Sequence, residues 1–149
     1  MLLEQTVSEH YANKHLLEKI YIGLGKLGID KSQLTPSDLS SFDEFHIGGS
    51  EGTLMLAEKL SINASSSVLD IGCGIGGPAR LLSSKIGCDV SGIDLTADFV
   101  STGNSLSDQV GLSDKVKLVE ASALNIPFAD NSFDVSYMIH VGMNIADKD

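Results

Sequence analysis

The chain has 149 residues, of which 42% are hydrophobic, and its formal net charge is −10 at pH 7. This length predicts one domain with enough apolar side chains for a real core. The 20 acidic residues outnumber the 10 basic ones, which argues against a nucleic-acid partner and favours a small-molecule ligand. No apolar run reaches the roughly 18 residues of a membrane span, so we expect no membrane partner.

The chain start and the two cysteines bear on location and metal binding. The first residues, Met1 to Gln5, lack the basic and long apolar regions of a signal peptide, so we expect a cytoplasmic protein. Cys73 and Cys88 form no C-x-x-C pair and accompany no His/Cys cluster. We therefore expect buried, inert thiols and no metal site.

The first predicted helix begins after Thr6. Thr6 and Glu9 fit a capping box, and apolar residues then recur at helical spacing as far as Leu27. This pattern predicts an amphipathic helix with one buried face.

Two shorter helices are predicted next. Thr35 followed by Pro36 is typical of a helix start, and this helix is expected to end before Phe42. A further helix is expected over 51–60, with Ser50 as its cap.

From residue 68 onward, predicted strands alternate with predicted helices. Strands are expected at 68–71, 90–93, 116–119 and 133–139, and helices at 78–86 and from a Thr96 cap to about 110. This alternation predicts a parallel sheet with right-handed crossovers. The fold class is therefore α/β.

A glycine loop is the most informative feature of the chain. The stretch Val68-Leu69-Asp70-Ile71-Gly72-Cys73-Gly74-Ile75-Gly76 reads as an apolar strand that enters this loop. Such a loop, followed by a helix start, lays backbone amides around a nucleotide-like ligand. Gly72, Gly74 and Gly77 also fit G-x-G-x-x-G, so an NAD-dependent oxidoreductase and a ligand-free turn remain alternatives.

Two carboxylates bear on the choice of ligand. Asp70 precedes the first loop glycine by two residues, where it would repel a pyrophosphate. It suits a positively charged ligand, and S-adenosylmethionine carries an ammonium and a sulfonium. Asp94 closes the second predicted strand, where an α/β nucleotide site places the carboxylate that binds ribose hydroxyls. Asp94 fits NAD and S-adenosylmethionine equally, whereas Asp70 favours S-adenosylmethionine.

The segment 70–76, Asp-Ile-Gly-Cys-Gly-Ile-Gly, resembles the first motif of the class I S-adenosylmethionine-dependent methyltransferases. Residues 43–49, Asp-Glu-Phe-His-Ile-Gly-Gly, resemble the lead-in of a branch related to the sarcosine and dimethylglycine N-methyltransferases. The resemblance implies a partial Rossmann-like methyltransferase fold with strands in the order 3-2-1-4, N-terminal helices, and the family's C-terminal strands missing. It implies a helical lead-in and cofactor lid over 1–62 and a truncated S-adenosylmethionine-binding domain over 63–149.

The resemblance also implies where the cofactor is held. The residues expected to hold its methionine part are Asp70, Gly72, Cys73, Gly74 and Gly76.

The remaining cofactor contacts are expected from segments that follow the other strands. Asp94 should bind the ribose hydroxyls, and Leu95 should pack on the adenine. Ser122 stands where the family often has an acidic residue for the adenine amino group, and Ala123 offers its backbone amide.

Two histidines complete the candidate site. His46 precedes Ile-Gly-Gly in the lead-in and is a candidate for the cofactor entrance. His140 follows the fourth strand, where it is a candidate contact for the methionine end or a candidate catalytic base. Both histidines also have a purely structural alternative.

The function that follows is an S-adenosylmethionine-dependent methyltransferase acting on a small molecule, with an amine as the candidate acceptor. Proximity and desolvation supply most of the rate acceleration of methyl transfer, so no nucleophilic side chain of the enzyme is required. We expect weak or absent turnover by this truncated form. A non-catalytic fragment that binds cofactor or self-associates is the alternative.

The predicted fourth strand also suggests self-association. It would form a sheet edge beside a face without its covering helices, and parallel sheets bury both faces. Such an edge invites pairing with another chain. We expect a homodimer centred on residues 133–145, because a two-fold symmetric dimer is the commonest closed assembly of identical chains.

Overall fold

The structure is a computed structural model that describes Gln5 and residues 15–43 and 48–145. The predicted helix start at Thr6 and Glu9 lies outside the described residues, as does His46. No helix of the described part is long and apolar enough to cross a membrane.

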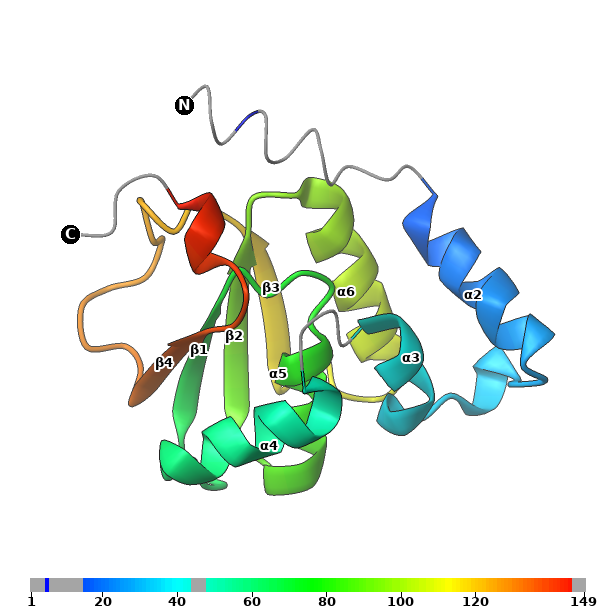
Figure 1. The fold of residues 1–149 in the computed structure, drawn as a ribbon, viewed down its shortest axis with the longest axis horizontal. Coiled ribbons are helices and arrows are strands. Elements are labelled where there is room, and N and C mark those ends of the chain that lie inside the picture. Colours follow the sequence, from blue (N-terminus) through cyan, green and yellow to red (C-terminus); the bar gives the residue numbers. More distant parts are fainter. Residues whose placement is uncertain (1–4, 6–14, 44–47, 146–149) are drawn as a thin grey trace.

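Short helices make up most of residues 15–43 and 48–60 of the described N-terminal part (Figure 1). They are α2 (Leu16–Lys26), two 3-10 turns (Lys31–Gln33 and Pro36–Leu39), α3 (Ser40–Asp43) and α4 (Gly49–Lys59). The predicted start at Thr35 is confirmed, because the Asp38 carboxylate accepts a hydrogen bond from the Thr35 backbone N–H at 2.9 Å.

Two helix boundaries differ from their predictions. The turn that begins at Pro36 continues into α3, so Phe42 lies within a helix, because Ser40 keeps right-handed helical angles. α4 begins before the predicted Ser50 cap. Its N-cap is Gly48, whose φ of 97° is a left-handed conformation that glycine adopts without strain.

A parallel sheet, two α-helices and a 3-10 turn after the last strand (Gly142–Asn144) form the rest of the described fold. The strands are β1 (Ser67–Ile71), β2 (Asp89–Asp94), β3 (Val116–Glu120) and β4 (Val135–Met138), and the helices are α5 (Gly77–Ile86) and α6 (Ala97–Gln109). The strand order is β3-β2-β1-β4, and every pair is parallel, which confirms the predicted partial methyltransferase sheet. α5 begins one residue before the predicted Pro78.

β4 is shorter than the predicted strand over 133–139. At its start, the Asp134 backbone N–H donates to the Ser67 carbonyl at 2.8 Å, while the Ser67 N–H donates to the Asp134 side chain at 2.8 Å and not to a backbone carbonyl of the strand. At its end, His140 takes a left-handed φ of 55°, which turns the chain out of the sheet.

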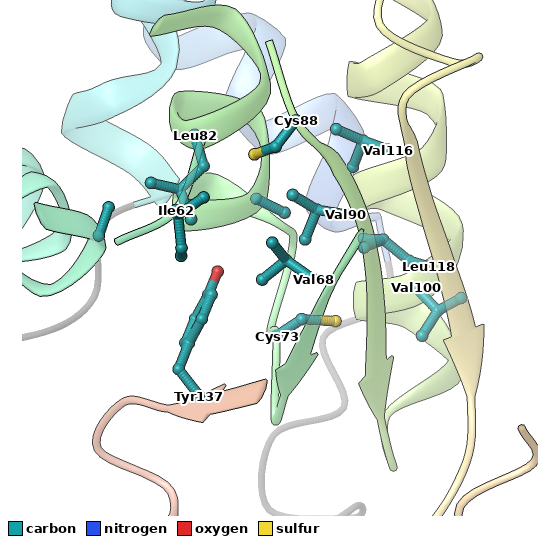
Figure 2. Packing of buried hydrophobic residues seen from close by; sticks show 12 residues of the cluster. Ile62, Val68, Cys73, Leu82, Cys88, Val90, Val100, Val116, Leu118 and Tyr137 are labelled. Carbon is teal, nitrogen blue, oxygen red and sulfur yellow. The ribbon is translucent and has the colours of Figure 1, made fainter. Parts of the chain in front are cut away.

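The main core lies between the sheet and helices α4, α5 and α6. Figure 2 shows the Tyr137 ring extending from β4 into this core alongside Val68 and Ile62. Val68, Val90 and Val116 are partners across β1, β2 and β3, and they pack with residues of all three helices. The helices therefore cover the same sheet face.

A second apolar cluster joins the N-terminal helices to the glycine loop. It contains Leu24 of α2, Leu39, Ile75 of the loop and Leu106 of α6. The loop is thus supported by the N-terminal helices, while the proposed domain boundary at residue 62 stays a prediction.

Candidate cofactor site

The glycine loop between β1 and α5 is fixed to the end of β2. The backbone N–H groups of Gly72 and Cys73 both donate to the Ile93 carbonyl, at 2.8 and 2.9 Å. Gly72, Gly74 and Gly76 have φ values of 75°, 55° and 80°. Residues that carry a side chain rarely adopt such backbone angles, so the loop geometry favours glycine at these three positions.

The loop is packed on one side and open on the other. A Cβ added at Gly72 would collide with the Val141 side chain, whereas one added at Gly74 would find nothing within 4 Å. The backbone at Gly74 is therefore accessible to a ligand. This arrangement suits a group that approaches backbone amides closely.

Asp94 lies against the loop. One of its carboxylate oxygens accepts a hydrogen bond from the Gly74 N–H at 2.9 Å, and the other accepts from the Thr96 N–H at 2.9 Å. Thr96 holds the predicted N-cap position of α6, but its side chain makes no capping hydrogen bond. The half-buried Asp94 carboxylate thus fixes the glycine loop and the start of α6 together.

Asp70 lies beneath the loop and is paired with Tyr137. The Tyr137 hydroxyl donates to the Asp70 carboxylate at 2.9 Å, and both residues are buried. Burial, followed by the charge of Asp70, raises the pKa of Tyr137 well above its ordinary value, so the phenol stays protonated. Tyr137 was not among the predicted site residues. The available signal was the alternation of Val135, Tyr137 and Ile139, which puts all three on one face of a strand.

The two cysteines are buried, as expected. Burial, with a further effect of Asp70 and Asp94, raises the pKa of the Cys73 thiol well above its ordinary value. Burial also raises the pKa of Cys88. Both thiols are therefore neutral and poor nucleophiles at physiological pH. Within the described residues, no group of three His, Cys, Asp or Glu side chains could hold a metal ion.

The residues predicted for the adenine lie at the carboxyl ends of β2 and β3. The Ala121 N–H donates to the Asp94 carbonyl at 2.9 Å, which joins the two strand ends. The Ser122 hydroxyl accepts from the Leu124 N–H at 3.0 Å and so shapes the following turn. Leu95 and Ala123 are half-buried beside this junction. Their adenine contacts stay predictions.

His140 lies in the exposed turn after β4. The next residue, Val141, packs against Gly72, so this turn reaches the glycine loop. A role for His140 at the methionine end or as a base stays a prediction.

A buried ion pair that was not predicted joins α3, α5 and α6. The Arg80 guanidinium contacts the Asp43 carboxylate at 3.0 Å, and both side chains are almost fully buried. Arg80 also donates to the Gly103 carbonyl at 3.0 Å and the Ser107 hydroxyl at 3.2 Å. A Cβ at Gly77 would collide with the Asp43 carbonyl, so α3 lies directly on the start of α5. The available signal was that Arg80 stands among small and apolar residues at the start of α5.

Comparison with known proteins decides the family. Residues 68–149, more than half of the chain, match the family described as "Methyltransferase domain". The chain belongs to this methyltransferase family. The methyltransferase assignment decides against the NAD-dependent oxidoreductase.

Relatives of the methyltransferase chain are longer than it is. It is 35% identical over 112 residues to methyltransferase GfsG of Streptomyces halstedii, covering 75% of this chain and 40% of the relative. It is 38% identical over 101 residues to phosphoethanolamine N-methyltransferase 1 of Arabidopsis thaliana, covering 68% of this chain and 20% of the relative. The chain thus spans two fifths or less of these relatives.

A solved structure supports the cofactor. Geranyl diphosphate methyltransferase in complex with S-adenosylmethionine is 26% identical, with a TM-score of 0.58, covering 69% of this chain and 41% of that one. The prediction of S-adenosylmethionine as the cofactor is confirmed.

Proposed function

We propose that this methyltransferase chain binds S-adenosylmethionine over its glycine loop and serves methyl transfer to a small-molecule acceptor. The observation that carries the proposal is the accessible Gly74 backbone, with Asp70 beneath the loop and Asp94 against it. When bound, the cofactor supplies a methyl group on a positively charged sulfur. The chain's own residues bind it, orient it and exclude water.

The proposed contacts follow from the chemistry of each group. The Asp94 oxygens each accept one backbone hydrogen bond and keep further lone pairs for ribose hydroxyls. The start of α5 favours the cofactor carboxylate, because helix N-termini attract anions. Asp70 contributes negative charge for the ammonium group.

The adenine and entrance contacts complete the proposal. Leu95 packs on the adenine, Ser122 accepts a hydrogen bond from its amino group, and the Ala123 amide lies beside it. His46 is kept as a candidate for the entrance from its sequence position alone, and His140 is proposed to lie at the methionine end.

An amine is our proposed acceptor. The resemblance of residues 43–49 to the sarcosine and dimethylglycine branch supports it, as does the named activity of the Arabidopsis relative. A neutral amine aligned with the methyl group requires no catalytic nucleophile. The test is a panel of amine, hydroxyl and terpenoid acceptors with radiolabelled cofactor, in which labelling of non-amines only would reject the amine.

We also propose that the 149 residues bind cofactor but transfer methyl groups weakly. The support is their coverage of two fifths or less of the relatives' length. Robust turnover of any small acceptor by the purified chain would contradict this proposal. We further propose a cytoplasmic location and no nucleic-acid partner; the acidic composition supports the second of these.

A homodimer through β4 is the proposed assembly. Among the described strands, β4 pairs only with β1, and Met138 near its end is exposed. Sedimentation should show a dimer at micromolar concentration that M138K weakens. M55K, on exposed α4 surface, is the matched control and should leave it intact. A stable monomer would refute the dimer.

The central test is calorimetric titration of the chain with S-adenosylmethionine, S-adenosylhomocysteine and NAD. Binding of the first two and not of NAD is expected, because Asp70 suits a cationic methionine end. Binding of NAD alone, or of none of the three, would overturn the proposed function.

A further inference from the structure

We propose that Tyr137 is a positioning residue for the cofactor, which it serves by holding the Asp70 carboxylate in place beneath the glycine loop. The inference rests on the proposed function, and it concerns a residue for which the sequence offered no role.

The geometry of the pair is set by the sheet. Asp70 of β1 and Tyr137 of β4 are direct partners in the strand register, so their side chains leave the sheet on the same face. The Tyr137 hydroxyl lies 2.9 Å from the Asp70 carboxylate. Asp70 is 2% exposed and Tyr137 is 6% exposed. At this burial, a carboxylate depends on hydrogen-bond donors from the protein.

The direction of the hydrogen bond is fixed. Burial and the Asp70 charge both raise the pKa of Tyr137, so the hydroxyl retains its proton and donates it toward the carboxylate. A hydrogen bond to a carboxylate favours its ionised form and one orientation. Tyr137 thus supports the negative charge and the placement of Asp70.

The charge of Asp70 reaches the loop. Burial is the main cause of the raised pKa of Cys73, which lies between Gly72 and Gly74, and the charge of Asp70 is the next largest cause. Cys73 in turn packs against Gly92, the residue that faces Asp70 from β2. Asp70, two residues before Gly72, is therefore placed to attract the methionine ammonium that is proposed to lie near the loop.

This role predicts a selective effect on ligands. S-adenosylhomocysteine carries the ammonium group, whereas 5′-methylthioadenosine has the same adenine and ribose without it. If Tyr137 acts through Asp70, removing its hydroxyl lowers the affinity for S-adenosylhomocysteine and leaves the affinity for 5′-methylthioadenosine unchanged. A purely structural role would weaken both ligands equally.

The experiment is calorimetry of Y137F in the 149-residue chain with both ligands. The loss of one hydrogen bond to a charged group should weaken S-adenosylhomocysteine about tenfold. The affinity for 5′-methylthioadenosine should stay within about twofold. Y21F is the matched control, because the Tyr21 hydroxyl donates to Gln109 at 3.1 Å, away from the loop. It should change neither affinity.

The outcomes separate the two proposals. Unchanged S-adenosylhomocysteine binding by Y137F, or an equal loss for both ligands, overturns the role of Tyr137 and leaves the proposed function standing. Failure of the unaltered chain to bind either ligand refutes both. If Y137F does not fold on its own, it is tested in the D70N background, where the buried charge is gone. D70N should weaken S-adenosylhomocysteine selectively, and D70N/Y137F should weaken it no further. A further selective loss in the double variant, or unchanged or equal affinities in D70N, overturns the role of Tyr137.

Discussion

Replacing Arg80 by Met should destabilise the fold strongly. The substitution keeps an unbranched apolar stem of similar length and removes the guanidinium. Arg80 and Asp43 are 1% and 4% exposed, and their charged atoms lie 3.0 Å apart. Without the guanidinium, the Asp43 charge stays buried without its arginine partner, and Gly103 and Ser107 each lose a hydrogen bond.

The magnitude follows from this burial. Removing one partner of a buried ion pair costs about 3–5 kcal/mol. For a domain of this size, each kcal/mol shifts the melting temperature by about 2–4 °C, so a drop of about 6–20 °C is expected. Urea unfolding followed by circular dichroism gives the free energy, and a thermal scan gives the shift.

The exposed pair of Lys115 and Asp89 supplies the control. Its charged atoms are also 3.0 Å apart, but the side chains are 45% and 70% exposed. Surface pairs contribute about 0–1 kcal/mol, so K115M should cost no more than that. The double variant R80M/D43L should recover part of the loss, because apolar residues often replace buried ion pairs well. Equal losses for R80M and K115M would refute this reasoning.

Three further results are expected. D94A should weaken S-adenosylhomocysteine binding at least tenfold in calorimetry, because each charged hydrogen bond to a hydroxyl contributes about 1.5–3 kcal/mol; unchanged affinity would reject the assigned role. G72A should lower the melting temperature more than G74A, since both strain a left-handed residue but only the first meets the Val141 side chain; the reverse order would contradict the described loop packing. Cys73 and Cys88 should resist an aromatic disulfide reagent at pH 8 and react only after unfolding, because their raised pKa values keep both thiols protonated and burial shields them; rapid reaction in the native chain would show that the loop opens.

The strands and their order were predictable because local signals determine them. Short apolar runs marked β1 to β3, and the alternation with helices implied parallel pairing. The glycine loop was equally clear, since its angles require glycine at Gly72, Gly74 and Gly76. The boundaries of helices and strands were less predictable where residues distant in the sequence determine them. At the start of β4 the Ser67 N–H donates to the Asp134 side chain, a contact between residues 67 positions apart that no local pattern encodes.

The supporting residues of the site were not predictable for the same reason. Arg80 and Asp43 are 37 residues apart, and Tyr137 and Asp70 are 67 apart. Each pair forms only when the register and the helix packing are set. A charged or polar side chain on a buried face indicates that a partner exists, but the sequence does not name that partner.

The position of β1 has a consequence for synthesis on the ribosome. β1 lies between β2 and β4, yet Tyr137 follows Asp70 by 67 residues. At about 5–20 residues per second, that distance takes roughly 3–13 s to translate. During this interval the nascent chain can pair β1, β2 and β3, while the other edge of β1 and the Asp70 carboxylate still lack β4. The arrival of residues 135–138 closes that edge and delivers the tyrosine in the same step. A pause in translation just before them would therefore prolong the time in which an open strand edge can pair with a neighbouring nascent chain.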